Sequence, residues 1–203
     1  MIGVIDYGVT NLGSMLNMLR RVGAKAEAVT TPEQLLQATK LILPGIGHFD
    51  HGVAALAERG FVDALKSRVG GDGIPMLGVC LGMQLLGIGS EEGSAAGLGL
   101  VNAFSRRFDL PPESGLRVPH MGWNVLTPRR ADRVLGELAP NARFYFVHSY
   151  HVVCEDPDDV LATADYGSPF TAALQRGNVW GVQFHPEKSH KFGMRLLANF
   201  AAV

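Results

Sequence analysis

The sequence predicts an α/β fold: a mostly parallel central sheet flanked by helices, with a β-rich C-terminal half. In the first hundred residues, short apolar runs alternate with helical patterns, as in parallel strands joined by crossover helices. After about residue 100, strand-like segments follow one another, and only the C-terminus is helical again. At a prior of about 150 residues per domain, the 203 residues suggest one domain over 1–203.

Capping residues and breakers delimit the predicted elements. Asn11 and Thr31 are typical N-cap residues, Gly23 is a typical helix end, and Pro44 is expected to end the third strand. In the first half we expect strands at residues 2–6, 25–29, 40–43 and 75–79, and helices that begin at residues 11, 31, 50, 61 and 81. In the second half we expect strands at residues 103–108, 123–126, 143–147, 160–165, 171–175 and 179–184, and a last helix over 189–200.

Composition excludes several classes of protein. Apolar residues make up 47% of the chain and charged residues 18%, which is unlike a disordered protein. A net charge of -1 argues against nucleic-acid binding, and two cysteines are too few for a disulfide scaffold. The uncharged stretch 73–90 contains five glycines and Pro75, so we expect buried core there and no membrane span. Asp6 interrupts the apolar N-terminus, which is unlike a signal peptide and predicts a cytoplasmic protein.

The candidate nucleophile is Cys80, which stands in the pattern Gly-x-Cys-x-Gly between a predicted strand and a predicted helix. A nucleophile on such a sharp turn needs small residues two positions before and after it, and Gly78 and Gly82 meet this need. The N-terminus of the following helix would face the sulfur and favour the thiolate, which is the reactive form. Cys154 lies in no such pattern, so we interpret it as structural.

His185 and Glu187 are the candidate general base and the carboxylate that orients it. Pro186 favours an extended backbone at His185 and disfavours helix, and positions i and i+2 of an extended segment lie on the same side. Glu187 could therefore approach the imidazole and stabilise its charged form, as the third member of a triad does. The order of Cys80, His185 and Glu187 along the chain differs from the order nucleophile, acid, histidine of the α/β-hydrolases.

The backbone after the third predicted strand supplies candidate donors for an oxyanion hole. Gly45, Ile46 and Gly47 follow Pro44, and glycines at a strand end let the backbone approach a substrate closely. The N–H of Leu81 is the other natural donor. Two His-x-x-His pairs have metal-ligand spacing but lack a third ligand, so no metal site is predicted.

Several motifs resemble those of the class I, or triad, glutamine amidotransferases; they lie at residues 43–47, 78–84 and 183–187. Other segments are similar to one family within this class, the glutaminase subunits of imidazole glycerol phosphate synthase; they lie at residues 5–8, 11–12, 119–124, 145–150 and 186–189. The resemblance covers essentially the whole chain, and it implies a flavodoxin-like fold and no cofactor. It also implies that Cys80 attacks the side-chain amide of glutamine, that His185 moves protons, and that Glu187 orients His185.

The resemblance implies further site residues and a partner. The residues expected around the bound glutamine are Gln84, Glu92, His148, Ser149 and Tyr150. A contact with the partner is expected at Pro119, His120, Met121, Gly122 and Trp123. The partner would be a (β/α)8-barrel cyclase subunit that forms a heterodimer with this chain. It would use ammonia to make imidazole glycerol phosphate and an aminoimidazole carboxamide ribotide in histidine biosynthesis.

Chain length independently indicates a partner. Ammonia near neutral pH is mostly ammonium, which is not nucleophilic, so the site that accepts ammonia must be close and shielded from water. A chain of 203 residues that is occupied by a glutaminase leaves no room for a synthase domain. A second polypeptide is therefore expected.

Departures from the family pattern leave alternatives open. Thr10 stands where the family often has Gly, and residues 149–151 and 189–194 are closer to a paralogous branch that supplies ammonia for an amidino group on a surface sugar. The triad does not distinguish these two. A cysteine peptidase on the same fold would leave Gln84 and Glu92 without a role. A catalytically silent binding subunit would be expected to lack a member of the triad.

Overall fold

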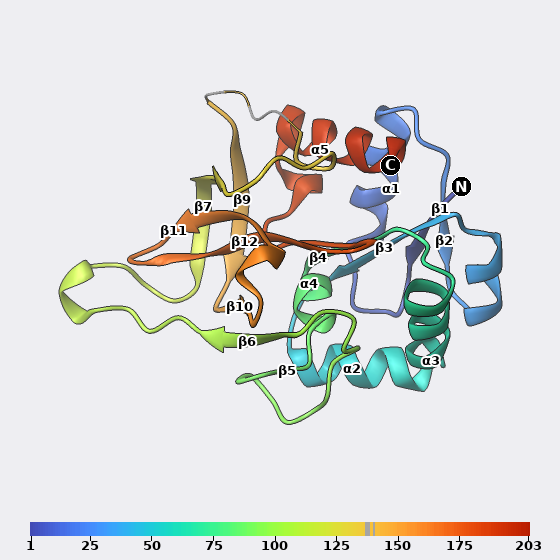
Figure 1. Cartoon of the computed structure of the whole chain (residues 1–203), viewed down its shortest axis with the longest axis horizontal. Helices are drawn as coiled ribbons and strands as arrows, with labels where there is room; N and C mark the ends of the chain where they lie inside the picture. The colour runs from blue at the N-terminus through green and yellow to red at the C-terminus, as the bar shows by residue number, and fades with distance from the viewer. Residues whose placement is uncertain (137–138, 140) are drawn as a thin grey trace.

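A mixed β-sheet forms the centre of the molecule (Figure 1), in a computed structural model that describes residues 1–136, 139 and 141–203. From one edge inward, the parallel part of the sheet consists of β2 (Ala26–Val29), β1 (Ile2–Ile5), β3 (Lys40–Gly45), β4 (Met76–Cys80) and β13 (Val179–Val182). The predicted crossover helices connect strands of this part of the sheet. The predicted parallel core is therefore confirmed.

Beyond β13 the sheet continues with antiparallel strands. They are β12 (Pro169–Arg176), β10 (Tyr150–Cys154) and β6 (Ala103–Arg107), and the short β5 (Gly89–Ser90) ends the sheet beside β6. A branch is formed by β11 (Val160–Asp165) on β12 and by β8 (Thr127–Pro128) on β11. A separate antiparallel ribbon pairs β7 (His120–Val125) with β9 (Arg143–His148). The second half is thus rich in strands, as predicted.

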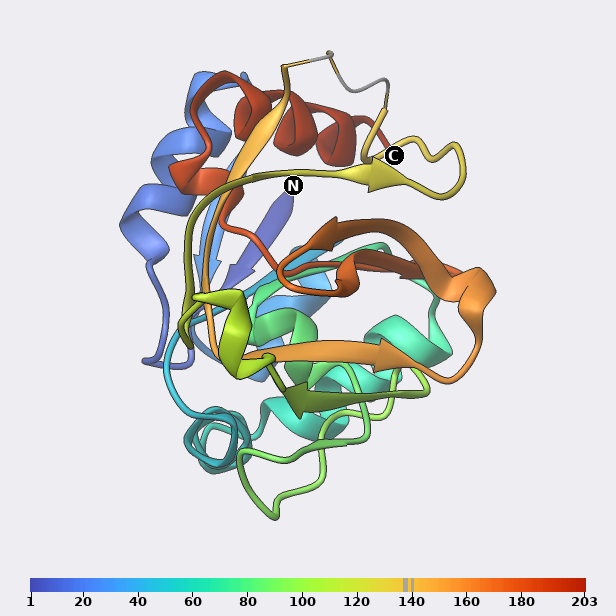
Figure 2. The same ribbon diagram turned by 90° about the vertical axis from the view of Figure 1, so that its left-hand side faces the viewer.

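Helices cover both faces of the parallel part, as Figures 1 and 2 show from two sides. One face carries α1 (Leu12–Arg21) and α5 (His190–Ala202), and the other carries α2 (Phe49–Glu58), α3 (Phe61–Leu65) and α4 (Leu81–Leu85). The pleat of β3 explains how one strand serves both layers. Ile42 packs into the cluster that contains Leu196 of α5, whereas Leu41 and Leu43 pack into the cluster that contains Phe49 of α2.

Short helical turns complete the chain, and proline starts many of them. The 3₁₀ turns are Pro32–Gln37, Pro112–Ser114, Pro157–Asp159 and Pro186–Lys188, and a π-helical turn at Lys66–Gly71 extends α3. Each of the four 3₁₀ turns begins at its proline, because the fixed φ of proline suits the first helical position and its missing N–H is not needed there.

The structure corrects one predicted boundary that matters for the site. Pro44 does not end β3: the strand continues to Gly45, and Pro44 and Gly45 pair with Val79 and Cys80 of β4. Proline removes one N–H from the ladder, which is tolerable near the end of a strand. The extension places Gly45 directly beside Cys80. The strand β10, which separates β12 from β6, was not predicted from the sequence.

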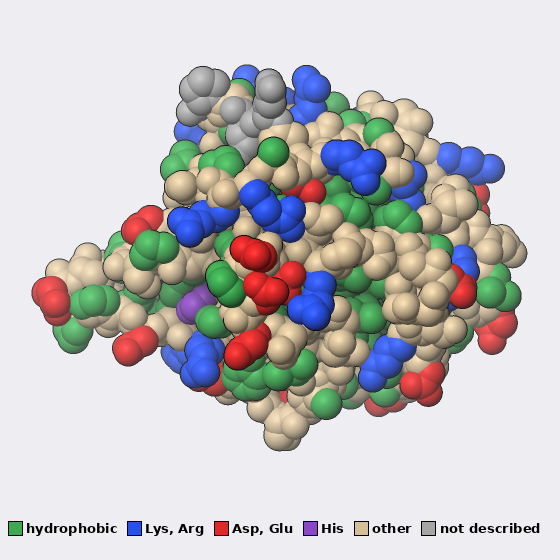
Figure 3. All heavy atoms as spheres, viewed as in Figure 1, with side chains coloured by type: hydrophobic (Ala, Val, Ile, Leu, Met, Phe, Trp, Pro, Cys, Tyr) green, Lys and Arg blue, Asp and Glu red, His purple; other side chains and the backbone are tan. Residues whose placement is uncertain are grey.

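The face drawn in Figure 3 carries charged side chains of both signs. Acidic and basic side chains are interspersed there with apolar ones, in keeping with the net charge of -1. Among the described residues, no helix has both the length and the apolar character needed to span a bilayer.

Candidate active site

Cys80 lies where β4 passes into α4, in a strained backbone conformation. Its φ of 54° and ψ of -111° are adopted by few residues other than glycine. A Cβ atom on Gly82 would lie 1.8 Å from the carbonyl oxygen of Leu43, and one on Gly78 would lie 2.8 Å from the carbonyl oxygen of Gly82. The turn therefore requires glycine at both positions, and this packing holds the sulfur at the carboxyl edge of the parallel strands.

His185 reaches the same edge because β13 is the parallel neighbour of β4. The backbone N–H of His185 donates to the carbonyl of Tyr145 at 2.9 Å, and the hydroxyl of Ser189 donates to the carbonyl of His185 at 2.6 Å. Both backbone groups of His185 are thus engaged. The ribbon strand β9 therefore takes part in placing the imidazole.

Glu187 contacts His185 as expected, by a route that differs from the expected one. The distance from Nδ1 of His185 to Oε1 of Glu187 is 2.8 Å, and both side chains are almost completely buried. His185 is extended, as predicted, but Pro186 begins a 3₁₀ turn, so the expected extended path from His185 to Glu187 was wrong. The tight turn, rather than an extended path, returns the carboxylate to the ring.

The electrostatics of this pair favour a charged imidazole. Burial alone lowers the pKa of His185, but hydrogen bonding and charge from Cys80 and Glu187 outweigh it and raise the pKa to about 10. Nε2 of His185 makes no hydrogen bond to a nitrogen or oxygen atom of the described residues. It is therefore free to exchange a proton with the thiol of Cys80.

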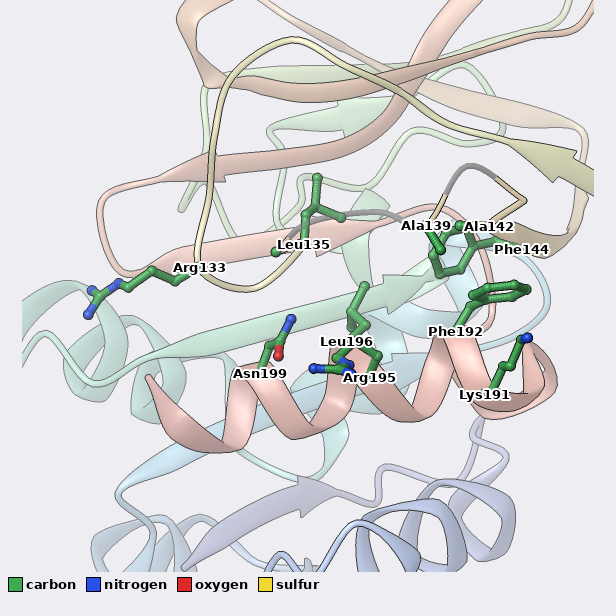
Figure 4. A pocket seen from close by; sticks show the side chains of 11 residues that line it. Arg133, Leu135, Ala139, Ala142, Phe144, Lys191, Phe192, Arg195, Leu196 and Asn199 are labelled. Atoms are coloured by element: carbon green, nitrogen blue, oxygen red, sulfur yellow. The ribbon is translucent and has the colours of Figure 1, made fainter.

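A cavity of about 310 Å³ opens in front of Cys80. All of the residues expected around glutamine line it: Gln84, Glu92, His148, Ser149 and Tyr150. Three members of the expected oxyanion hole, Ile46, Gly47 and Leu81, also line it, as do Pro119 and Lys188. Its size suits a small metabolite. A larger cavity of about 600 Å³ lies over α5, where Arg133, Lys191 and Arg195 line it (Figure 4), and it does not include Cys80 or His185.

The oxyanion donors are only partly arranged as expected. The N–H of Ile46 donates to the carbonyl of Val9 at 3.1 Å, so in this conformation it is not available to an oxyanion. Gly45 is buried, and a Cβ there would lie 2.9 Å from that of Leu81. Leu81 is the first residue of α4, where backbone N–H groups have no partner within the helix. Leu81 thus remains the donor that the fold already presents.

The segment expected to contact a partner divides between surface and interior. Met121 and Trp123 are 62% and 41% exposed, whereas His120 is only 4% exposed. Alternate side chains of a strand face opposite sides, so β7 turns His120 inward when it turns its neighbours outward. The side chain of His120 is therefore turned away from this surface, and a partner contact at residues 119–123 stays a prediction. Pro119 lines the cavity, and Gly122 is half-buried.

One residue beside Cys80 was not predicted from the sequence. Gln183 is completely buried, and its Nε2 lies 3.8 Å from Sγ of Cys80. Gln183 stands two residues before His185, within the motif at residues 183–187, but no role was predicted for its side chain. A polar side chain at the end of an otherwise apolar strand was the available signal.

Comparison with known proteins identifies the class. The family model described as glutamine amidotransferase class-I matches residues 3–203, so the chain belongs to the class I glutamine amidotransferases. A crystal structure of a glutamine amidotransferase has the same fold, with a TM-score of 0.72 and 23% identity over 100% of this chain and 99% of the other. The structure of PurLQS from Thermotoga maritima gives a TM-score of 0.71 at 21% identity, over 98% and 96% of the two chains.

Curated relatives narrow the class to one family. Imidazole glycerol phosphate synthase subunit HisH 2 of Pseudomonas aeruginosa is 54% identical over 100% of both chains. HisH 2 of Methanococcus maripaludis is 48% identical over 98% of both, and HisH of Leptospira interrogans is 46% identical over 100% of both. Within class I, the chain belongs to this HisH family of enzyme subunits.

Proposed function

We propose that the chain hydrolyses glutamine with Cys80, His185 and Glu187 and supplies the ammonia to a synthase partner. The buried contact of 2.8 Å between His185 and Glu187, beside the strained Cys80, carries this proposal. Residues 1–203 would act as one amidotransferase domain. Thiol, imidazole and water suffice for the chemistry, so we propose no cofactor and no metal.

The reaction would proceed through a thioester. The thiolate of Cys80 attacks the side-chain amide carbon of glutamine, a C–S bond forms, and the N–H of Leu81 stabilises the oxyanion. His185 gives its proton to the leaving nitrogen, the C–N bond breaks, and ammonia departs. His185 then takes a proton from water, whose oxygen attacks the thioester carbon. The C–S bond breaks, glutamate is released and the Cys80 thiolate is restored, while Glu187 stabilises the imidazolium in both steps.

Hydrogen-bond acceptors in the cavity suit the α-ammonium of an amino acid. Both amide hydrogens of Gln84 are used, one by the carbonyl of Tyr150 at 3.1 Å and one by Oε1 of Gln183 at 3.2 Å, so its own Oε1 is left for a ligand. Glu92 uses Oε2 to accept the backbone N–H of Phe49 at 2.8 Å, which leaves its other oxygen. These two acceptors support the assignment of Gln84 and Glu92 to substrate binding.

We propose a (β/α)8-barrel cyclase subunit of the HisF type as the partner in a heterodimer. The names of the relatives describe subunits of imidazole glycerol phosphate synthase, which supports a place in histidine biosynthesis. We propose the cytoplasm as the compartment. The exposed side chains of Met121, Trp123 and Val125 form an apolar stripe along β7, on the strand that starts beside the cavity. A partner seated there would receive ammonia close to Cys80.

The N–H of Ile46 is already used in a hydrogen bond, which supports a low glutaminase activity of the chain without its partner. Its hydrogen bond to Val9 must break before Ile46 can join Leu81 as an oxyanion donor. We therefore expect hydrolysis of glutamine to be slow until the partner docks, which would avoid the loss of ammonia to water.

One observation favours the paralogous function as a second candidate. The relatives at 54% and 48% identity both carry the name HisH 2, as a second copy in an organism would, whereas those named HisH without a numeral are at 43–46%. In that case the ammonia would form an amidino group on a surface sugar. The glutaminase half of the reaction would be the same.

Glutamate release from glutamine tests the proposal, measured for the chain alone and with a cyclase subunit. We expect the cyclase to raise turnover strongly and Cys80→Ala to abolish it. Equal turnover with and without the cyclase would contradict the proposed partner, and turnover retained by Cys80→Ala would contradict the nucleophile. Growth of a histidine auxotroph that lacks its own glutaminase subunit separates the two pathways: rescue supports histidine biosynthesis, and failure of an active chain to rescue supports the paralogous branch.

A further inference from the structure

A pair of buried amide side chains links the glutamine cavity to the sulfur of Cys80. Gln183 directly follows β13 and is completely buried, and Gln84 of α4 is 5% exposed. Nε2 of Gln84 lies 3.2 Å from Oε1 of Gln183, whose Nε2 in turn lies 3.8 Å from Sγ of Cys80. The triad mechanism gives Gln183 no task, although a buried amide requires partners.

The direction of this chain of hydrogen bonds follows from its far end. The carbonyl of Tyr150 can only accept, so the Gln84 atom 3.1 Å from it must be the nitrogen. That nitrogen also faces Gln183 and can only donate there, so the facing Gln183 atom must be the oxygen. The remaining end of Gln183, which faces the sulfur, is therefore its NH₂ group. An N–H donor, not a lone pair, is directed at Cys80.

The Tyr150 carbonyl that sets this direction is itself held in place. Nδ1 of His148 lies 2.8 Å from it and must donate, since the carbonyl accepts. Burial first, and then neighbouring histidine charges, lower the pKa of His148 to about 3, so the ring is neutral and its Nε2 accepts from Nδ1 of His120 at 3.1 Å. Two donors thus converge on one carbonyl. The orientation of the amide pair cannot reverse without breaking this network.

We infer that Gln183 is a positioning residue, which donates an amide N–H to the sulfur of Cys80 and stabilises it as the thiolate before glutamine binds. The inference rests on the proposed function of Cys80 as nucleophile. A hydrogen bond to the charged form of a group favours that form. Gln183 therefore complements His185: the imidazolium supplies charge on one side of the sulfur, and the amide supplies a fixed dipole from the sheet.

Gln183→Met tests this inference, because methionine keeps the length and approximate volume of the side chain but has no N–H. The measurement is the rate of alkylation of Cys80 by iodoacetamide against pH, read by mass spectrometry so that Cys154 is counted separately. We expect the midpoint of the profile to rise by about one to two pH units, as for a lost hydrogen bond to a charged group. We expect kcat for glutamine to fall by about tenfold with little change in KM.

A matched control comes from the neighbouring strand. Gln175 of β12 donates to the carbonyl of Gly177 at 2.9 Å and lies outside the site, so Gln175→Met should leave the profile unchanged. The other titratable groups coupled to Cys80 are His185 and Tyr7, and neither is substituted in these variants. A shift confined to Gln183→Met would therefore report the lost amide.

A second measurement, on the Gln183 side chain of the wild-type protein, tests the inference even if Gln183→Met does not fold. The Nε2–H resonances of Gln183 in the wild-type chain should move with pH at the midpoint of Cys80 alkylation, and Cys80→Ala should remove this movement. An unshifted alkylation midpoint in a folded Gln183→Met variant would overturn the inference. Nε2–H resonances of Gln183 that do not move at the midpoint of Cys80 alkylation would also overturn it. Absence of glutaminase activity in the wild-type complex would overturn the proposed function instead, because the alkylation profile needs no turnover.

Discussion

The carboxylate of Glu187 forms a buried hydrogen bond with the imidazole of His185. Burial of a histidine alone favours the neutral ring, so the raised pKa of about 10 depends on the nearby sulfur and carboxylate. Cys80 and Glu187 together thus keep a proton on His185 at neutral pH. In the proposed mechanism, this proton is transferred to the leaving nitrogen of glutamine.

Glu187→Gln should lower the pKa of His185 and slow catalysis while preserving shape. Glutamine cannot supply the negative charge, so we expect the NMR titration of the His185 ring to move well below its wild-type midpoint. Loss of the orienting carboxylate should reduce kcat by about two to four orders of magnitude. Glu155→Gln, at an exposed position, is the control and should change neither quantity. An unchanged His185 titration in Glu187→Gln would show that Glu187 does not hold the imidazolium.

At the scale of elements, the strand–helix turn around Cys80 is held by contacts that leave no space for a side chain. The closest approach is between Gly82 and the carbonyl of Leu43, where a Cβ atom would lie 1.8 Å from the oxygen. Both atoms belong to the backbone, so neither can move aside without shifting β3 or α4. The elbow is therefore the element least tolerant of added volume.

Gly82→Ala should destabilise the fold and disturb the nucleophile. Overpacking against fixed backbone costs roughly 1–3 kcal/mol or more, and urea unfolding at neutral pH measures it. Gly13→Ala is the matched control, since a Cβ there meets no atom within 4 Å and Gly13 lies within α1. Alanine in a helix should leave stability unchanged or raise it by about 0.5–1 kcal/mol. Equal stability of the two variants would contradict the packing described for the elbow.

Local pattern predicted the elements that local contacts determine. Alternation of strands and helices, the elbow at Cys80 and the neighbouring His185 and Glu187 are all visible within short windows of sequence. The extension of β3 through Pro44 and the strand β10 depend on pairing with β4 and β6, which are distant in the chain. Tertiary pairing of this kind overrides local signals, so sequence alone placed these boundaries wrongly or not at all.

Side-chain direction also lay beyond the sequence. A resemblance can place residues 119–123 at a contact, but only the register of β7 against β9 shows that His120 turns inward toward His148. The hydrogen bond of Ile46 to Val9 and the amide of Gln183 beside Cys80 join segments far apart in the chain in the same way. The members of the site were largely predictable, whereas their orientations were not.

At the scale of the whole molecule, buried histidines predict how stability depends on pH. His185, with its pKa raised to about 10, contributes stability that is fully present below about pH 6.5 and is lost as the pH rises toward 10. His120 and His148, whose pKa values are lowered by burial to about 4 and about 3, act in the opposite direction. Below about pH 6.5 these two histidines bind protons in the unfolded chain but stay neutral in the folded chain. Stability should therefore fall on both sides of about pH 6.5.

Urea unfolding across the pH range measures this dependence. On the acid side, each proton bound only in the unfolded chain contributes about 1.4 kcal/mol per pH unit, so His120→Gln should flatten the slope by about that amount. His51→Gln is the control, since His51 is exposed and lies on the solvent face of α2. An acid slope that is the same in His120→Gln and in the wild type would contradict a neutral, buried His120.

The proposed mechanism requires that Cys80 attacks glutamine and forms a glutamyl thioester. Rapid acid quenching of the wild-type chain with its cyclase partner and glutamine, followed by peptide mass spectrometry, tests it most directly. We expect the added mass of one glutamyl group on the peptide that contains Cys80, absent from the Cys154 peptide and from Cys80→Ala. Glutamate formation without any adduct at Cys80, or an adduct on another residue, would contradict the proposed role of Cys80.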